Sequence, residues 1–361
     1  MLVLAVNAGS SSLKLSVLDG DQVVAARELP APRAVVETRE LEDALDGLPA
    51  AHAVGHRIVH GGARVAPALV DAALVAELEA LVDLAPLHQP KSLAALRAVS
   101  GALPGVPAVA CFDTAFHATL PPAAATIPVP AGWRERFGLR RYGFHGLSHA
   151  WAARRASALL GRPARVVTCH LGAGASLAAV HDGVCVDTTM SFTPLDGLVM
   201  ATRSGSVDPG LVLWLAERLG DDEVADGLEH RSGLTALAGT GDMRELLARD
   251  DPDALLALEV YLHALVAHVA AMAAAMDGLD ALVFTGGVGE RAPAIRARAA
   301  ARLRFLGVAV DDERNAAAAG EADVSAPGAT ARTLVVPSRE DAVIARHVRD
   351  VLGEAALSPG A

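Results

Sequence analysis

The sequence predicts an α/β protein made of two related domains, and three observations support this prediction. The chain has 361 residues, which is enough for two hydrophobic cores. Residues 2–20 read as an apolar strand, a polar turn, a second strand and an Asp-Gly hairpin turn. The same order of features recurs at residues 166–183. A duplicated domain explains both stretches.

The recurrence aligns without a gap when Asn7 is placed on His170, an offset of 163 residues. Only four of fourteen positions are then identical, so the shared order of features carries the argument. Each half would present a phosphate-binding loop. A nucleotide would then bind in the cleft between the halves.

The first turn has the chemistry that a phosphate needs. Gly9 allows close approach of the backbone, three serines supply donors, and Lys14 adds a positive charge. It is not a P-loop, because the GxxxxGK[ST] pattern and a following helix are both absent. A plain polar hairpin is the alternative interpretation.

The composition excludes several partners. A net charge of −11 argues against nucleic acid and anionic membranes, so an anionic substrate would need a local cluster of arginine and lysine. The three cysteines have no metal-like spacing and predict reduced, buried thiols in a cytoplasmic protein. The N-terminus lacks the pattern of a signal peptide. The apolar tract at residues 262–276 contains two histidines and predicts a buried helix, not a membrane span.

Regular elements can be assigned along the chain from periodicity and breakers. The expected strands are residues 23–29, 106–112, 280–285 and 333–336; the expected helices are 35–48, 70–82, 92–100, a segment ending at 160, 211–219, 222–232, 251–276 and 342–352. Residues 121–130 are rich in proline and are expected to be irregular. They mark the crossing into the second domain.

Polar residues in apolar surroundings identify candidate site positions in the first half. Arg57 sits in an apolar strand and cannot lose its charge, so it needs an anionic ligand or a structural salt bridge. Asp113 follows a buried strand, where open α/β sheets place ligand groups, although a helix cap is equally consistent. His56 and His60 are four residues apart, but without an HExxH helix they do not predict a metal site.

Further candidates follow in the second half. Residues 140–149 concentrate two arginines, two histidines and two glycines, although Ser148 could equally cap the following helix. Arg203 lies in another glycine-rich segment. The strand at 280–285 runs into a glycine-rich loop, Gly286 to Gly289, and then a helix, an arrangement that favours anions.

Taken together, these segments resemble the acetate kinase family, within the superfamily of acetate and sugar kinases, Hsp70 and actin. The resemblance covers nearly the whole chain. The motifs that carry it are NAGSSSLK at 7–14, GHRIVHGG at 55–62, PLHQP at 86–90, FDTAFH at 112–117, RYGFHGLSH at 141–149, HLGAGAS at 170–176, TPLDGL at 193–198, ATRSGSVDP at 201–209, TGGVGER at 285–291 and SREDAVIA at 338–345.

The resemblance implies an α/β fold of two ribonuclease-H-like (actin-like ATPase) domains with the active site in the cleft between them. The expected division is residues 1–120 with the C-terminal helix at 341–361, and residues 121–340 with the nucleotide site. It also implies a homodimer that transfers the γ-phosphate of ATP directly to acetate, giving acetyl phosphate and ADP, with Mg²⁺ or Mn²⁺ as the cofactor.

The resemblance further implies roles for individual residues, carried over motif by motif. The catalytic residues would be Arg57, Asp113, His145, Arg203 and Glu340, with His145 and Arg203 stabilising the transition state and Asn7, Asp113 and Glu340 at the metal. The carboxylic acid would meet Arg57, Val59, Leu87, His88 and Pro194. The nucleotide would meet Ser10, Ser12, Lys14, His170, Leu171, Gly172, Ala173, Gly174, Asp242, Met243, Arg244, Gly286, Gly287, Val288 and Gly289.

Three departures from the family pattern bear on rate and on nucleotide preference. Ala173 stands where the family usually has asparagine, Gln89 replaces the asparagine after His88, and Arg291 replaces the asparagine after GGVGE. Two alternatives therefore remain beside acetate kinase. One is a kinase for propionate or butyrate, and the other is a non-catalytic nucleotide-binding relative.

Overall fold

The computed structural model describes residues 1–9, 12–30, 38–86 and 88–353. Of the predicted site residues, Ser10 and Leu87 lie outside the described part of the chain. By their contacts, the residues form two compact units. The first unit comprises Met1–Ala118, Phe144–Trp151 and Arg339–Ala361, and the second comprises Thr119–Gly143 and Ala152–Ser338. This grouping differs from the expected division in one substantial place, residues 144–151. The expected domain boundaries themselves stay a prediction.

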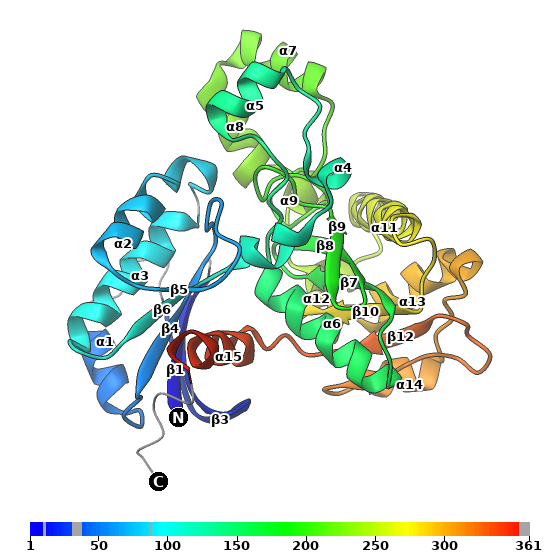
Figure 1. Ribbon diagram of the computed structural model, residues 1–361. Helices are drawn as coiled ribbons and strands as arrows, with labels where there is room; N and C mark the ends of the chain where they lie inside the picture. The colour runs from blue at the N-terminus through cyan, green and yellow to red at the C-terminus, as the bar shows by residue number, and fades with distance from the viewer. Residues whose placement is uncertain (10–11, 31–37, 87, 354–361) are drawn as a thin grey trace. The chain divides into compact units, whose positions relative to one another are not determined.

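The first unit is a six-stranded sheet with helices on both faces (Figure 1). Its strands are β1 (Leu2–Ala8), β2 (Ser12–Asp19), β3 (Gln22–Pro30), β4 (Ala53–Ile58), β5 (Ala68–Leu69) and β6 (Ala108–Phe112), in the order β3-β2-β1-β4-β6-β5. Its helices are α1 (Thr38–Asp46), α2 (Ala72–Glu79), α3 (Gln89–Ala102) and α15 (Glu340–Leu352), with 3-10 turns η1 (Val82–Leu84) and η2 (Asp113–Thr119). Strands β1, β4 and β6 are parallel neighbours, and β2 and β3 extend the sheet antiparallel.

Alternation along the strands decides which face each side chain meets. Leu4, Val6 and Val54 point to the face that packs against α1 and α3. Gly55 points to the opposite face, where α15 lies, and a Cβ there would be 2.3 Å from Ile344. The first glycine of the GHRIVHGG motif is therefore explained by helix packing, because any side chain at this position would push α15 away from β4.

The second unit repeats this topology. Its strands are β7 (Arg165–Leu171), β8 (Ala175–His181), β9 (Val184–Thr188), β10 (Ala281–Thr285), β11 (Ala322–Asp323) and β12 (Arg332–Val335), in the order β11-β12-β10-β7-β8-β9. Its helices are α4 (Pro122–Ala125), α5 (Ala131–Phe137), α7 (Pro209–Leu219), α8 (Asp221–His230), α9 (Gly233–Ala238), α10 (Met243–Leu247), α11 (Pro252–Ala274), α12 (Gly286–Arg291), α13 (Pro293–Arg302) and α14 (Asp312–Ala317), with the 3-10 turn η3 (Arg304–Leu306). Helix α6 (Gly146–Leu160) begins in the first unit and ends in the second.

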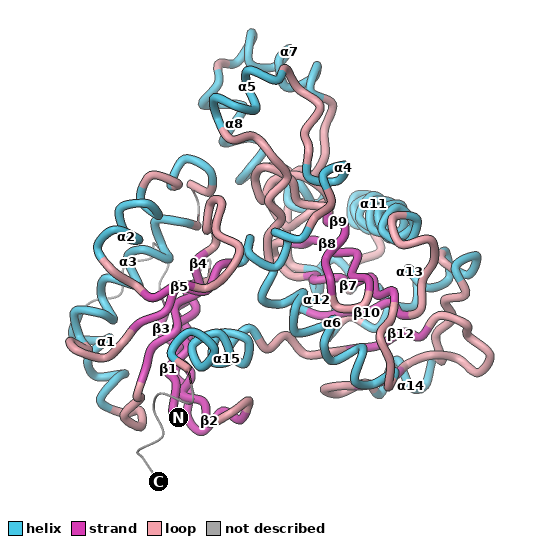
Figure 2. The backbone as a smooth tube through the Cα atoms, in the orientation of Figure 1, coloured by secondary structure: helices cyan, strands magenta, loops and turns pink. Residues whose placement is uncertain are grey.

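The two sheets, whose strands are magenta in Figure 2, have corresponding strand orders, so the predicted duplication is confirmed. The gapless alignment is wrong beyond the first turn, however. Ala8 pairs with Leu13, whereas Leu171 pairs with Ala175, so the second turn is one residue shorter. The bulges confirm this shift, because they fall between Val17 and Leu18 in one unit and between Ala179 and Val180 in the other.

Two local expectations also need correction. The proline-rich segment contains the short helix α4, because Pro122 occupies the first helical turn, where its missing N–H costs nothing. The segment after β10 is not a loop. Helix α12 begins directly at Gly286, whose φ of 77° makes the sharp turn from strand to helix.

The longest helix, α11, packs against β7 and β8 and buries Leu258, Leu262 and Leu265. It is the one described helix long and apolar enough to cross a membrane, by length and composition alone. A core helix passes the same test, and packing on a sheet is typical of a core helix. The three cysteines are buried and unpaired with one another, as expected.

Candidate active site

Four polar side chains of the first unit meet at one edge of its sheet. Asn7, Arg57 and Asp113 lie at or just beyond the carboxyl ends of β1, β4 and β6, which are parallel neighbours. Glu340 is the first residue of α15, which packs across these strands. The sequence predicted each of these residues separately, and the register of the sheet brings them together.

Arg57 is the centre of this four-residue cluster. Its Nε and Nη2 donate to Asp113 Oδ2 at 3.0 and 2.7 Å, and its Nη1 donates to Asn7 Oδ1 at 3.0 Å. Nη1 also lies 3.2 Å from Glu340 Oε2, which accepts a 2.6 Å hydrogen bond from the Asn7 amide. The salt-bridge interpretation of Arg57 is thus confirmed, and it does not exclude an anionic ligand.

Burial penalises the charged side chains of this cluster, and their ion pairs offset that penalty. Asp113 is fully buried, and its Oδ1 has no hydrogen-bond partner among the described residues. Burial alone would lower the pKa of Arg57, but the Asp113 and Glu340 carboxylates outweigh it and hold that pKa above its usual value. Arg57 therefore stays charged at every relevant pH. The free oxygen of Asp113 remains available to a cation.

The segment that carries His145 lies directly against Asp113. Gly146 approaches so closely that a Cβ there would collide with the Asp113 carbonyl oxygen. His145 itself adopts a φ of 54°, a conformation that a residue with a side chain rarely takes. Such strain concentrates at functional sites. Ser148 lies inside α6, so it is not the N-cap of that helix.

The segment after β4 is braced by Gln89. The side-chain oxygen of Gln89 accepts from the His60 N–H at 3.0 Å, and its nitrogen donates to the His60 carbonyl at 2.9 Å. Val59, predicted to wall the acid pocket, is 5% exposed, and His88 is half-buried just before α3. Gln89, which stands where the family usually has asparagine, is therefore a buried residue that holds the His60 backbone in place.

The predicted phosphate residues of the first turn are only partly placed together. Lys14 is directly opposite Asn7 in the ladder of β1 and β2, so the two side chains share a face of the sheet. Ser12, in contrast, donates its hydroxyl to Glu28 Oε1 on β3 at 2.6 Å. In the described structure the Ser12 hydroxyl is therefore bonded to the neighbouring strand β3.

In the second unit, the two glycine-rich segments lie at the ends of neighbouring strands. His170 at the end of β7 pairs in register with Thr285 at the end of β10. A Cβ on Gly286 would be 2.8 Å from the Leu171 carbonyl oxygen, so the first turn of α12 lies on the end of β7. The Gly172 N–H donates to the Gly174 carbonyl in the turn between β7 and β8. Ala173, at the centre of this turn, is exposed.

The Arg203 segment is attached to this turn. Ala201 donates its N–H to the Ala173 carbonyl at 3.0 Å. Arg203 Nη1 donates to the Pro194 carbonyl at 2.6 Å, and no carboxylate of the described residues lies within 4 Å of its guanidinium. Burial lowers the pKa of Arg203, and Glu229 partly opposes this. Unlike Arg57, Arg203 has no carboxylate in direct contact among the described residues.

The segment predicted to hold adenosine is adjacent to Ala201, against which Gly241 packs. Asp242 caps α10 and pairs with the exposed Arg244, which lowers the pKa of Asp242 to about 2. Met243 is buried, with 5% of the residue exposed. Arg291 folds back and donates to the Gly287 carbonyl at 3.3 Å.

Sequence analysis pointed to the segment that contains Arg141 but gave this residue no role, and it did not single out Arg296. Arg141 Nη1 donates to the Thr188 carbonyl at 3.0 Å and its Nε to the Ala124 carbonyl at 3.2 Å. Arg296 is 1% exposed. Its only signal in the sequence is its position among Ile295, Ala299 and Ala300, the apolar stripe of α13.

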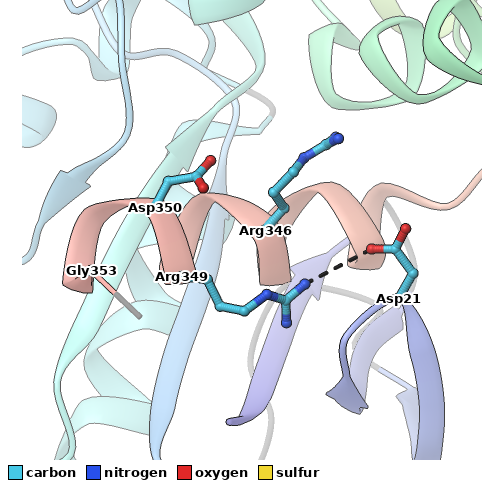
Figure 3. A pocket seen from close by; sticks show the side chains of 5 residues that line it. All are labelled: Asp21, Arg346, Arg349, Asp350 and Gly353. Carbon is cyan, nitrogen blue, oxygen red and sulfur yellow. Dashed lines mark ion pairs between the residues drawn. The ribbon is translucent and has the colours of Figure 1, made fainter. Parts of the chain in front are cut away.

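A separate pocket of the first unit has a volume of about 410 Å³ and holds none of the predicted site residues. It lies beside α15 and the turn between β2 and β3, and it is lined by Asp21, Arg346, Arg349, Asp350 and Gly353 (Figure 3). Arg349 donates to the Gly20 carbonyl at 3.0 Å and lies 3.8 Å from Asp21. These contacts fasten α15 to the turn.

Comparison with known proteins decides the family. The sequence model that describes the acetokinase family matches residues 33–346 of this chain. An acetate kinase of Carboxydothermus hydrogenoformans is 39% identical over 395 aligned residues, which cover 98% of this chain and 99% of the relative. The chain belongs to the acetokinase family. An acetate kinase of Bacillus mycoides is 44% identical over 305 residues, covering 82% of this chain and 77% of the relative.

Solved structures of relatives agree with this assignment to the acetokinases. Porphyromonas gingivalis acetate kinase superimposes with a TM-score of 0.87 at 33% identity, covering 97% of this chain and 99% of that chain. A propionate kinase from Francisella tularensis gives the same TM-score and identity, covering 96% and 98%. The predicted fold class of two actin-like ATPase domains is therefore confirmed.

Proposed function

We propose that this acetokinase transfers the γ-phosphate of ATP to acetate, forming acetyl phosphate and ADP reversibly. The observation that carries the proposal is the four-residue cluster around Arg57, in a chain whose relatives are named acetate kinases. A non-catalytic relative would have no need to keep a buried arginine between two carboxylates beside a strained histidine.

The reaction does not require a general base, because the attacking carboxylate is already ionised. A carboxylate oxygen attacks the γ-phosphorus, the bond from that phosphorus to the β–γ bridging oxygen breaks, and ADP leaves without any proton transfer. The difficulty is the repulsion between two anions, and positioned cations overcome it. Arg57 would hold the acid or the phosphoryl group. Arg203 would supply the unneutralised charge, and His145 would donate to the moving phosphoryl oxygens.

The first cluster also fits a divalent cation. Mg²⁺ takes oxygen ligands, commonly one or two carboxylates together with substrate phosphates. Asp113 offers the free, buried Oδ1, and Glu340 and Asn7 lie in the same cluster. A bound Mg²⁺ would neutralise charge on the phosphates. Asp113 and Glu340 would hold it, and Asn7 would orient Glu340.

Nucleotide binding is proposed for the second unit. The turn from His170 to Gly174 would meet the phosphates, and Asp242 to Arg244 with Gly286 to Gly289 would meet the adenosine. The adjacency of these segments supports this, since β7 and β10 are neighbours and Gly241 packs on Ala201. Lys14 and Ser12 of the first unit are proposed phosphate contacts, although Ser12 would have to leave Glu28.

A second candidate is a propionate kinase, because a structure so named matches as well as an acetate kinase does. The side chains that would discriminate are Val59, Pro194 and Leu87, which lies outside the described residues. One methylene in such a pocket changes transition-state binding by only about 1–3 kcal/mol, so overlapping activity is expected.

The test is trapping of the acyl phosphate with hydroxylamine in the presence of Mg-ATP, across acetate, propionate and butyrate. The highest kcat/KM with acetate is the expected result. A maximum at propionate or butyrate would retain the mechanism and reassign the substrate. Folded protein that binds ATP and yields no acyl phosphate with any acid would refute the proposal.

A cytoplasmic homodimer is also proposed. Helix α7 exposes Leu211, Leu213, Trp214 and Leu219, which is more apolar surface than a free helix usually presents to water. A second copy of the chain could cover this face. Sedimentation should report a dimer, and Leu213→Glu should weaken it. An unchanged mass for the variant would place the interface elsewhere.

A further inference from the structure

The largest fully buried side chain of the described residues is Arg296, on α13 of the second unit. Only 1% of it is exposed, and no carboxylate of the described part of the chain lies within 4 Å of its guanidinium. Burying an unneutralised charge costs several kcal/mol unless its donors are fully used. The position of Arg296 therefore requires an explanation.

The guanidinium connects two helices through four hydrogen bonds. Nη1 donates to the carbonyls of Gly289 and Glu290, at 2.9 and 2.8 Å, in the last turn of α12. Nε and Nη2 donate to the side-chain and backbone oxygens of Asn315 on α14, at 2.7 and 2.8 Å. Asn315 is itself fixed by a 2.9 Å bond from its amide to the Pro293 carbonyl.

These acceptors explain how the charge is tolerated. The last carbonyls of a helix have no partner within the helix and carry partial negative charge, so a cation there is favourable. Arg296 thus satisfies the carboxyl end of α12. A short helix of this kind cannot hold its own shape, since six residues close at most two internal hydrogen bonds.

Helix α12 is fastened at three points by contacts outside itself. Gly286 rests on the end of β7, Arg296 holds the carbonyls of Gly289 and Glu290, and the Glu290 side chain accepts from the Ser338 N–H at 2.9 Å. Gly287 and Val288 lie between these points and are half-buried. The fastened helix is thus held by its ends while its middle stays accessible.

We propose that Arg296 is a positioning residue for nucleotide binding: it fixes the backbone of α12 so that Gly287 and Val288 present a preformed surface to the nucleotide. This inference rests on the proposed function, which places the nucleotide on α12. It concerns nucleotide affinity and not the transfer step. Arg296 touches neither reactant.

The test compares Arg296→Met, Arg296→Lys and Asn315→Ala with the parent protein. Arg296→Met removes the charge and all four bonds, and the KM for ATP should rise about tenfold to a hundredfold, as expected for misplacing a binding surface. The KM for acetate should stay within about twofold. Arg296→Lys should recover part of the loss, because it keeps one donor to the carbonyls of α12. Asn315→Ala should shift the KM for ATP in the same direction by less.

Arg298→Met is the matched control, because Arg298 lies on the same helix but is only half-buried and pairs with Glu259. It should leave both KM values unchanged. If Arg296→Met lowers the melting temperature but leaves the KM for ATP unchanged, Arg296 is only structural and the inference fails. If Arg296→Met does not fold, the lysine and Asn315 variants decide by the same comparison.

Direct binding separates this inference from the proposed function. ADP affinity is measured by calorimetry for the parent and each variant, without any acid present. A parent protein that binds ADP but phosphorylates no carboxylate would refute the proposed function, while the loss of ADP affinity in Arg296→Met would still support the inference. Equal ADP affinity in the parent, both Arg296 variants and Asn315→Ala would overturn it. A parent that does not bind ADP would refute both.

Discussion

At the scale of single residues, the two arginines predicted to act on the reactants differ in their surroundings. Arg203 donates to the Pro194 carbonyl, and no carboxylate of the described residues lies within 4 Å of its guanidinium. We expect Arg203→Ala to fold normally but to lose about 10²–10³ in kcat/KM, the usual cost of one donor to a developing charge. Steady-state kinetics of acyl phosphate formation measure this. Near-full turnover in the variant would show that the mechanism assigned to Arg203 is wrong.

Arg57 should behave differently, because it neutralises two buried carboxylates. Arg57→Ala leaves Asp113 and Glu340 facing each other without a cation, and such a loss typically costs about 3–5 kcal/mol of stability. We therefore expect loss of activity together with a lower free energy of unfolding in urea. Arg57→Ala with Asp113→Asn should recover part of the stability and none of the activity. A single variant as stable as the parent would contradict this view of the cluster.

Ala173 offers a gain-of-function test. The family usually has asparagine at this position, and the Ala173 side chain is exposed at the turn between β7 and β8. Ala173→Asn should therefore fold without strain and add an amide donor for a phosphate. The KM for ATP should fall by about threefold to tenfold, the value of one such hydrogen bond. Ala173→Leu is the control of similar size without a donor, and it should give no gain.

At the scale of elements, Gly55 tests the packing of α15 on β4. A Cβ at this position would be 2.3 Å from Ile344 and 2.7 Å from Val348. Gly55→Ala should destabilise the protein by about 1–3 kcal/mol, as overpacking does. Gly101→Ala is the matched control, since it lies on α3 with nothing within 4 Å of its added Cβ. It should be neutral or stabilising, because alanine favours a helix.

The same scale shows what the sequence could and could not predict. Apolar segments, polar turns and Asp-Gly turns were enough to find the strands of both hairpins and the duplication. They did not reveal the one-residue shift after the first turn, because only the pairing of Leu171 with Ala175 shows it. Motifs identified Arg57, Asp113 and Glu340 one at a time. Their mutual distances depend on which strands are neighbours, and that is a property of the whole sheet.

Buried polar residues were the least predictable. Arg296 has no motif that separates it from the exposed arginines around it on α13, and its role follows only from the carbonyls it meets. Gln89 was noticed as a departure from the family, but its bracket on the His60 backbone could not be inferred. In both cases most of the partners are backbone groups from another element, and backbone groups carry no sequence signal.

At the scale of the whole molecule, three buried histidines should make stability depend on pH. His56, His60 and His117 are at most 1% exposed, and all belong to the first unit. Burial lowers the pKa of His56 to about 3 and those of His60 and His117 to about 4, from an ordinary 6.5. The folded protein keeps these rings neutral where the unfolded chain would protonate them.

The sign of the effect follows from proton binding. Below pH 6.5 the unfolded chain binds more protons at these three sites than the folded protein does, so lowering the pH favours unfolding. Each histidine should cost on the order of 1–2 kcal/mol between pH 7 and pH 5, and the free energy of unfolding in urea should fall accordingly. Burial also lowers the pKa of His347 to about 4, so His56→Leu should remove about a quarter of the measured pH dependence. Neither His56 ring nitrogen has a hydrogen-bond partner among the described residues to lose. A variant with the same slope as the parent would mean that His56 is not among the groups that protonate on unfolding.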